Sequence, residues 1–316
     1  MIWYNNKKYE IYFEGSVNKT AYRRLTQEEQ EERWQSLTIS DDFLFCKILS
    51  DMTLCAEMLH RIFPDLDVRG IKPVKTQKSE KLDLHIRGVR FDVFTSIAKS
   101  FFDAEMQKRR LDDVFKRPRA YQTVITYRGL EQDTLKKSGN YKDLPDAYVV
   151  FICNFDPFRK GRHIYSFQNY CTEDKEIALG DGAHIVYLNT KGKLDDVSPA
   201  LKRFLDFVGK NKVSKGDSFI ETLDRKVKEA KKNTQWRHEF MMLLTIEDEK
   251  FAEGRAEGLA EGKAEGRAEG RAEGIAIGEQ RSQHKIYERL ISSGKFSPQE
   301  AAEATGWNAN SSYGMN

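Results

Sequence analysis

Two acidic residues lie inside apolar, strand-like runs, where a carboxylate is costly unless a cation meets it. Asp92 lies in VRFDVF, and Glu105 lies in FFDAEMQ. If these two strands pair, Asp92 would lie beside Glu105 and Gln107. Two carboxylates held together repel each other unless a cation bridges them. Mg²⁺ suits such a pair, because it takes carboxylate oxygens and keeps several waters for a substrate's phosphates.

A basic stretch follows the second run directly. Residues 108–119, KRRLDDVFKRPR, hold six basic residues against two acidic ones and could grip phosphates. Bound Mg²⁺ can activate a water molecule for attack on a phosphate. The two acids and the basic stretch together therefore indicate a phosphodiesterase site. The spacing leaves two alternatives open. The acids could lie exposed on their strands, or pair internally with Arg90 or Arg109.

The elements that would position these residues alternate between strand and helix, which predicts an α/β domain. Arg87-Gly88 indicates a hairpin turn between the first two strands. The predicted strands are 82–86, 89–94, 101–107, 147–153, 163–167 and 183–188, and a further hairpin is predicted within residues 2–13.

Helical segments flank and separate the strands. The apolar spacing of residues 40–63 predicts one amphipathic helix, with Ser40 or Asp41 as its cap and Pro64 beyond its end. Further predicted helices are 25–36, 108–137 with Pro118 as a kink or restart, 197–209 and 218–244.

Five segments follow from these patterns. They are an N-terminal extension (1–37) that need not join the core, an α/β domain (38–210), a helical segment (211–250), an Ala-Glu-Gly repeat (251–280) and a small helical C-terminal part (281–316).

The repeat has a period of four residues, with glycine from Gly254 to Gly278 at every fourth position. Each glycine costs a helix about 1 kcal/mol relative to alanine. A four-residue step also drifts by about 40° per repeat around a helix, so no single stripe persists. The repeat is therefore either a flexible or weakly helical linker, or a helix ordered by self-association into a homo-oligomer.

The C-terminal segment predicts a helix, a turn at Gly294 and a second helix opened by Ser297-Pro298. Two such helices suit a docking appendage better than a reader of DNA bases. The net charge is +3; residues 252–279 contribute −3 (four basic, seven acidic), which leaves +6 for the rest. This mild excess is compatible with a polyanionic partner.

Composition excludes several classes of protein. The chain has no run long and apolar enough for a membrane span and no secretory apolar stretch at its start, so we expect a soluble, cytoplasmic protein. The scattered histidines give little support for zinc. The four cysteines, which show no CxxC spacing, are expected to be reduced core thiols.

The order of motifs resembles the PD-(D/E)XK nuclease superfamily, and more narrowly its transposase or recombination-promoting nuclease group. SDDFLFCKIL is similar to the group's opening helix, VRFDVF to its first catalytic strand and DAEMQ to its second. RPRAYQTVITY and YKDLPDAYVVFIC are similar to the next helix and strand, and the AEGRAEG tail is similar to tails of the group. The resemblance covers residues 38–280 and implies a restriction-endonuclease-like mixed sheet flanked by helices.

The resemblance also implies roles for individual residues. Asp92 and Glu105 would bind Mg²⁺ or Mn²⁺ with help from the Met106 carbonyl, and Gln107 would orient the attacking water. Gln107 stands where the wider superfamily has lysine, so it supplies no charge.

Further roles are implied around that centre. Asp42 would add an acid, with Glu57 as the fallback, although either could simply cap or solvate its helix. Lys108, Arg109, Arg119 and Tyr121 would contact DNA, although Arg119 and Tyr121 could merely pack. We expect a metal-dependent DNA endonuclease linked to recombination or transposition. The alternative is an inactive nuclease-fold protein that binds nucleic acid or a protein.

Overall fold

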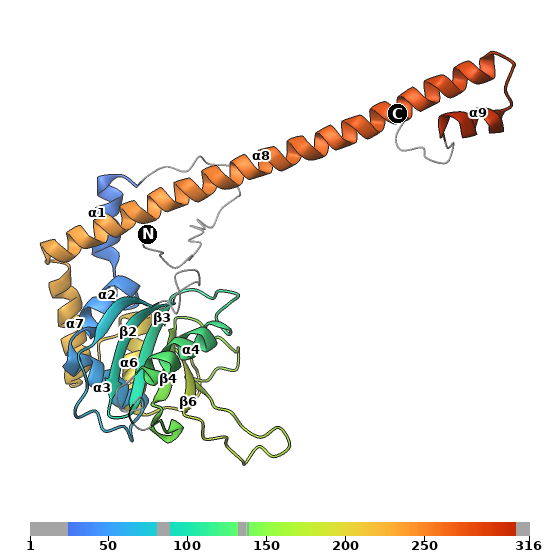
Figure 1. Ribbon diagram of the computed structural model, residues 1–316. Helices are drawn as coiled ribbons and strands as arrows, with labels where there is room; N and C mark the ends of the chain where they lie inside the picture. The colour runs from blue at the N-terminus through green and yellow to red at the C-terminus, as the bar shows by residue number, and fades with distance from the viewer. Residues whose placement is uncertain (1–24, 81–88, 132–136, 138, 308–316) are drawn as a thin grey trace. The chain divides into compact units, whose positions relative to one another are not determined.

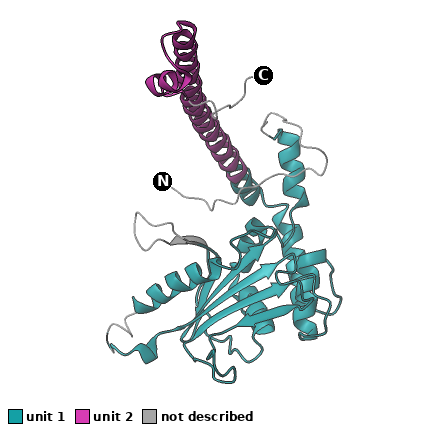
Figure 2. Cartoon of the chain, turned by 90° about the vertical axis from the view of Figure 1, so that its right-hand side faces the viewer, with its two compact units in different colours: residues 1–242 teal, residues 243–316 magenta. Residues whose placement is uncertain are grey.

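The computed structural model describes residues 25–80, 89–131, 137 and 139–307 of the 316-residue chain. The predicted hairpin within residues 2–13, strand 82–86 and the turn at Arg87-Gly88 lie outside the described residues. The chain forms two compact units, residues 1–242 and 243–316 (Figure 2).

The first unit is an α/β fold with a mixed six-stranded sheet flanked by helices. Its strands are β1 Lys75–Glu80, β2 Val89–Ile97, β3 Ser100–Gln107, β4 Asp146–Cys153, β5 Ile164–Phe167 and β6 Ala183–Asn189. Its helices are α1 Gln27–Ser36, α2 Asp42–Leu49, α3 Met52–Ile62, α4 Arg117–Leu130, α6 Pro199–Lys210 and α7 Ser218–Ala230, with the short 3-10 helix η1 Tyr141–Asp143. Helix α8 Thr234–Ser292 leads into the second unit, which also contains α9 Pro298–Thr305.

The strands lie in the order β1-β2-β3-β4-β6-β5 (Figure 1). Strands β1, β2 and β3 pair antiparallel, β3, β4 and β6 pair parallel, and β5 returns antiparallel to β6. In the parallel register, Gln107 is level with Cys153 and Cys153 with Asn189. The carboxyl ends of three strands therefore meet at one edge of the sheet, which we name the carboxyl edge.

Apolar side chains cover both faces of the sheet, as expected for strands buried between helices. On one face, Tyr121, Val124 and Ile125 of α4 join a core with Val149 and Phe151 of β4. On the other face, the ring of Phe63 at the end of α3 lies 5.9 Å from Phe102 and 5.1 Å from Tyr148.

The single amphipathic helix predicted for residues 40–63 is wrong in one respect, because it is divided. Helix α2 ends at Leu49 and α3 begins at Met52. The carboxylate of Asp51 accepts the backbone N–H groups of Thr53 at 2.9 Å and Leu54 at 3.4 Å. This N-cap gives the second helix its own start, because an Asp side chain satisfies donors at a helix N-terminus.

The helix predicted for residues 108–137 is too long at its start. Helix α4 begins at Arg117, with Pro118 in its first turn, where the missing N–H of proline costs nothing. Residues 108–116 form turns, so Pro118 starts the helix and does not kink it. The helix predicted for 218–244 is similarly divided, since α7 ends at Ala230 and α8 begins at Thr234.

Residues 25–37, predicted to be part of an N-terminal extension that need not join the core, pack against the core of the first unit. Helix α1 forms as expected, with a capping box between Thr26 and Glu29. The indole of Trp34 is fully buried, and its ring lies 6.0 Å from Phe43 and 5.5 Å from Phe240. This aromatic cluster joins α1, α2 and the start of α8.

The Ala-Glu-Gly repeat is helical in the structure. The two predicted alternatives, a flexible or weakly helical linker and a helix ordered by self-association, stay predictions. Residues 251–280 lie within α8, and nearly all are exposed. A Cβ added at Gly262 or at any other glycine of the repeat would meet open space. The second unit ends as the sequence predicts: Gly294 turns the chain at φ +71°, and Ser297 caps α9 through a capping box with Glu300. Within the described residues, no helix has the length and apolar character needed to cross a bilayer.

A buried ion-pair network joins α3, α6 and α7. Arg61 donates two hydrogen bonds to the carboxylate of Asp217, at 2.7 and 2.8 Å, and Arg203 donates a third at 2.6 Å. Burial alone would raise the pKa of Asp217, but the hydrogen bonds from Arg61 and Arg203 lower it well below its usual range. A carboxyl group with a depressed pKa stabilises the fold above its unfolded pKa and loses that contribution as the pH falls.

Asp217→Asn should therefore lower the free energy of unfolding at pH 7 by about 3 kcal/mol, because it leaves buried Arg61 without its anion. The difference from the wild type should shrink as the pH falls below about 4, because unfolding of the wild type then takes up a proton at this carboxyl group, and it should vanish below the depressed pKa of Asp217 in the folded state. Urea unfolding across this pH range measures both effects. Asp67→Asn is the control, since Asp67 pairs with Arg69 in the open and its loss should change little. Equal losses in the two variants would contradict this assignment.

Two glycine substitutions should have opposite effects. Gly262→Ala should stabilise the exposed repeat helix by about 1 kcal/mol and slow local amide hydrogen exchange. Gly192→Ala should lower the melting temperature, because its Cβ would lie 2.4 Å from the His163 ring. A repeat whose exchange is unchanged by Gly262→Ala would show that it is not helical in solution.

Candidate functional site

The two acids singled out from the sequence meet where strands β2 and β3 stop pairing through their backbones. Backbone pairing runs from Ile97–Ser100 to Val93–Ala104. Beyond it, the N–H of Asp92 donates to Oε1 of Glu105 at 2.8 Å, and the N–H of Met106 donates to Oδ2 of Asp92 at 3.2 Å. Each strand thus uses a carboxylate of the other where a carbonyl would ordinarily accept, and these hydrogen bonds are charge-assisted.

The side-chain alternation of β2 breaks at the same place. The sequence pattern predicts that Phe91 and Phe94 point to opposite faces of the sheet. Both belong to the core beneath α4, with ring centroids 4.8 Å apart, so this prediction is wrong. Such a local irregularity re-aims side chains next to it. Here the irregularity includes Asp92, whose carboxylate binds the neighbouring strand.

A third acid, Asp103, lies beside Glu105 and was not chosen from the sequence. Its side chain is fully buried, and neither carboxyl oxygen has a hydrogen-bond partner among the residues that the structure describes. Burial, then the charges of Glu105 and Asp92, raise the pKa of Asp103 well above its usual range. A buried acid without a donor either keeps a proton or faces a cation. In the sequence, the signal that Asp103 lies beside Glu105 was the side-chain alternation, which places both residues on one face of β3.

Arg117 supplies the positive charge at this site. Its Nη2 lies 3.3 Å from Oε2 of Glu105 and donates to the Tyr121 hydroxyl at 2.9 Å, while Nη1 donates to Oε1 of Gln107 at 2.8 Å. Burial acts to lower the pKa of Arg117, but Tyr121 and Glu105 outweigh it and the pKa is raised. The sequence alternatives for an internal partner were Arg90 and Arg109. The structure adds Arg117 as a partner of Glu105, and the pairings with Arg90 or Arg109 stay predictions. Arg117 is a member of the basic run and lies four residues before Tyr121.

Tyr121 supports the carboxylate and does not face a surface ligand. Its side chain is 3% exposed, and its hydroxyl donates to Oε2 of Glu105 at 2.9 Å. Its ring packs edge-on against Phe91 and Phe151. The residue is buried, as the alternative that Tyr121 merely packs expects, and its predicted contact with nucleic acid stays a prediction.

Gln107 is also buried, at 1% exposure. Its carbonyl oxygen accepts from Arg117, and its amide nitrogen has no hydrogen-bond partner in the structure. A buried amide donor without an acceptor is unusual and marks a place where a water or a ligand oxygen would be stabilised. The predicted orientation of a water by Gln107 stays a prediction.

The beginning of α2 lies near the same acids. Burial, then the charges of Asp92 and Asp42, raise the pKa of the Cys46 thiol. The charges of Asp92 and Asp42 therefore both reach Cys46, and the predicted role of Asp42 as a further acid of the site stays a prediction. The neighbouring Asp41 accepts a hydrogen bond from Lys108 Nζ at 2.6 Å, which ties α2 to the end of β3.

Other predicted residues lie away from this group. Glu57, the fallback acid, binds Arg61 at 2.8 Å within the network of α3, α6 and α7. Lys108, Arg109 and Arg119 are exposed, as phosphate contacts must be. Their roles toward DNA stay predictions.

The carboxylates fit a hard divalent cation in chemical type, since Mg²⁺ prefers oxygen ligands. The carboxyl oxygens of Asp103 lie beside Glu105 and would provide further oxygen ligands if the group lost its proton. Among the described ranges, no group of three or more His, Cys, Asp or Glu side chains forms a ready metal site. Arg117 holds Glu105 in its place, so a metal ion at Glu105 would compete with the guanidinium.

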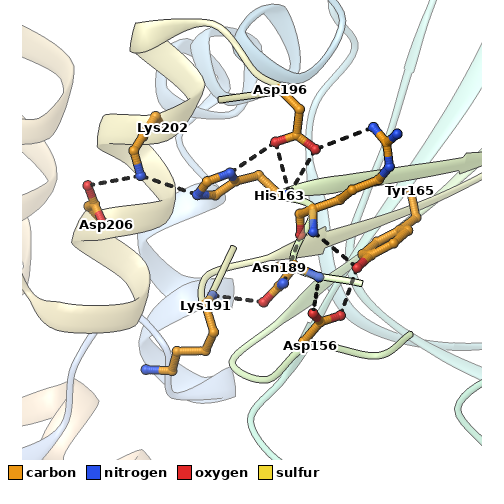
Figure 3. A network of polar contacts seen from close by, with 10 residues as sticks. Asp156, His163, Tyr165, Asn189, Lys191, Asp196, Lys202 and Asp206 are labelled. Carbon is orange, nitrogen blue, oxygen red and sulfur yellow. Dashed lines mark hydrogen bonds and ion pairs between the residues drawn. The ribbon is translucent and has the colours of Figure 1, made fainter. Parts of the chain in front are cut away.

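A second polar network lies at the β5 end of the carboxyl edge (Figure 3). His163 is 2% exposed; its Nδ1 is 3.0 Å from Asp196 and its Nε2 is 3.2 Å from Lys202 Nζ. Both ring nitrogens are therefore engaged by side chains. Asp196 also accepts the backbone N–H of His163. We interpret this network as a structural connection between the loops around β5 and β6, because the imidazole has no free nitrogen for a substrate.

Comparison with known protein families, with curated proteins and with solved structures finds no match to this chain.

Arg117→Gln should lower the free energy of unfolding in EDTA by about 3 kcal/mol, because it leaves the Glu105 carboxylate buried without a cation. Adding Mg²⁺ should raise the melting temperature of this variant more than that of the wild type, since the competing guanidinium is gone. Thermal unfolding with and without Mg²⁺ measures both effects.

Arg119→Gln is the matched control, because Arg119 lies two residues further along α4 and is exposed. It should behave as the wild type does. Adding Glu105→Gln to Arg117→Gln should recover stability in EDTA, since the uncompensated charge is then removed. A Mg²⁺ response equal in the Arg117 variant and the wild type would contradict competition at Glu105.

Proposed function

We propose that this protein is a metal-dependent DNA endonuclease with a restriction-endonuclease-like core, acting in the cytoplasm in recombination or transposition. One observation carries the proposal: Asp92 and Glu105 lie side by side at the point where β2 and β3 separate, each accepting a backbone N–H near the other. This supports the resemblance of VRFDVF and DAEMQ to paired catalytic strands.

The residues divide into three tasks. Asp92 and Glu105 would hold Mg²⁺ or Mn²⁺ with the Met106 carbonyl, and Asp42 would add an acid from α2. Gln107, with its unpartnered amide nitrogen, would orient the attacking water. Lys108, Arg109 and Arg119 are exposed and would contact the DNA backbone.

When bound, the metal ion would lower the pKa of a water and neutralise charge on the scissile phosphate. The chain's own side chains orient one of the acids for this task. Tyr121 and Arg117 hold Glu105 in one orientation through Oε2, while Oε1 is fixed by the N–H of Asp92. Because Arg117 already contacts Glu105, binding of a metal ion there would require Arg117 to release part of this contact.

The second candidate is a nuclease-fold protein that binds nucleic acid or a protein partner without cleaving. The position of Arg117 favours it specifically, because the guanidinium already neutralises Glu105. Gln107 favours it too, because an amide cannot supply the positive charge of the lysine expected in the wider superfamily. Self-association through the helical repeat of α8 is a further proposal that suits either candidate.

Nicking of supercoiled plasmid with Mg²⁺ or Mn²⁺ separates the two candidates. The wild type should nick, and Asp92→Ala should be slower by about 100-fold or more, the scale of removing one charged group from an active site. Asp65→Ala is the control, because it removes the same charge from an exposed position beyond α3. Equal rates for the wild type and Asp92→Ala, with both proteins folded, would favour the non-cleaving candidate.

A further inference from the structure

Three loops follow the parallel strands β3, β4 and β6 at the carboxyl edge. They comprise residues 108–116, 154–163 and 190–198. Because the three strands end level with one another, their loops emerge side by side. Together the loops hold nine Lys or Arg residues against five Asp residues. The fold thus combines three separate chain segments into one basic surface, which the sequence of any one segment does not reveal.

The loops are joined to each other by specific contacts. The N–H of Asn154 donates to the carbonyl of Gln107 at 2.9 Å, and the Thr190 hydroxyl donates to Oδ1 of Asn154 at 2.8 Å. The N–H of Lys193 donates to the carbonyl of Gly161 at 2.7 Å. The rings of Phe115 and Phe158 lie 5.1 Å apart, linking the first two loops.

The middle loop is organised around Asp156. Its carboxylate accepts the backbone N–H groups of Arg159 at 2.9 Å and Gly161 at 2.7 Å, and the hydroxyl of Tyr165 at 2.8 Å. Figure 3 shows the contact between Asp156 and Tyr165. The acid of this loop is thus used internally, and the loop is held in one shape. Preorganised contacts cost less ordering entropy on binding.

Exposed cations remain on this surface. Arg159, Lys160 and Lys193 are all exposed, and among the residues that the structure describes none of the three has an ion-pair partner. Arg159 also has a positive φ of +58°, which is uncommon for a residue with a side chain. Lys116 extends the surface toward Arg117 and Glu105, since it directly precedes α4.

We propose that the loop of residues 154–163, with Lys193 beside it, binds the phosphate backbone of duplex DNA across the carboxyl edge. This deepens the proposed nuclease function, on which the choice of DNA rests. Regularly spaced phosphates suit three cationic loops that are fixed relative to one another, because each can neutralise a phosphate without reordering. The exposed ring of Phe115, 43% exposed beside Arg110, adds an apolar contact in the same surface.

The test is the salt dependence of duplex binding by the full chain in EDTA, where cleavage does not interfere. Fluorescence anisotropy with a labelled duplex measures the association constant at several salt concentrations. A plot of the logarithm of this constant against the logarithm of the salt concentration gives the slope. Arg159→Gln combined with Lys160→Gln should reduce that slope by about 2, because each substitution removes one cation that neutralises a phosphate. Lys193→Gln alone should reduce it by about 1.

The control is Lys99→Gln combined with Lys142→Gln. It removes the same charge from exposed positions near the opposite edge of the sheet, where β3 and β4 begin. Its slope should equal that of the wild type. The proposal would be overturned if the slope were unchanged in the variant with both Arg159 and Lys160 replaced. It would also be overturned if the control reduced the slope equally, or if the wild type did not bind duplex DNA.

Plasmid nicking distinguishes this inference from the proposed function. A wild type that nicks while the Arg159 and Lys160 variant binds duplex normally would refute the inference alone. A wild type that does not nick, with the expected loss of slope in the variant, would refute cleavage and support the binding surface. Loss of binding to phosphatidylserine vesicles with unchanged duplex binding would identify an anionic membrane as the partner instead, and the proposal would be wrong.

Discussion

The balance of buried charge around Glu105 is the constraint on which the candidate site depends. Three acids, Asp92, Asp103 and Glu105, are buried with 4% exposure or less. An unpaired buried charge would cost several kcal/mol. In the fold, Arg117 pairs with Glu105 and the Tyr121 hydroxyl donates a hydrogen bond to it. Backbone N–H groups at the point where β2 and β3 stop pairing donate further hydrogen bonds to the carboxylates. The cleaving and non-cleaving candidates differ in whether Arg117 is a permanent counterion or one that a metal ion can displace.

The parallel arrangement of β3, β4 and β6 extends this local constraint to a whole edge of the sheet. It places the end of the acid-bearing strand β3 beside the ends of two other strands and beside their loops. Lys108 joins the same edge to α2 through Asp41. Buried acids and exposed cations therefore lie at neighbouring positions with different roles. The acids are shielded from water, whereas the cations are open to solvent.

Much of the fold could be predicted from the sequence, because apolar runs and alternation carry the signal of a buried strand. Strands β2 to β6 lie where these patterns predicted them, and the α/β class is confirmed. Strand β1 was missed, since KTQKSE is polar throughout and its pairing with β2 is a tertiary contact. The starts of α3 and α4 depend on single residues, Asp51 and Pro118. One residue is a weaker sequence signal for a helix start than repeated apolar spacing is for the helix itself.

The site was predictable in part. The strand order brought Asp92 and Glu105 together, as their spacing suggested. The lack of a donor at Asp103 is a property of packing, which no local pattern reveals. Arg117 was counted within a basic run, yet it differs from Arg119 by facing inward. Its four-residue spacing from Tyr121 was the signal that the two share a helix face.

The period of the α8 repeat has a consequence for variation among copies of this sequence. Gain or loss of one four-residue unit would change the length of the helix by about 6 Å and rotate its C-terminal end by about 40° around the helix axis. Because the glycines of the repeat face open space, neither change would create a steric conflict within the helix. The number of four-residue units therefore sets the length of the helix while its surface chemistry stays the same.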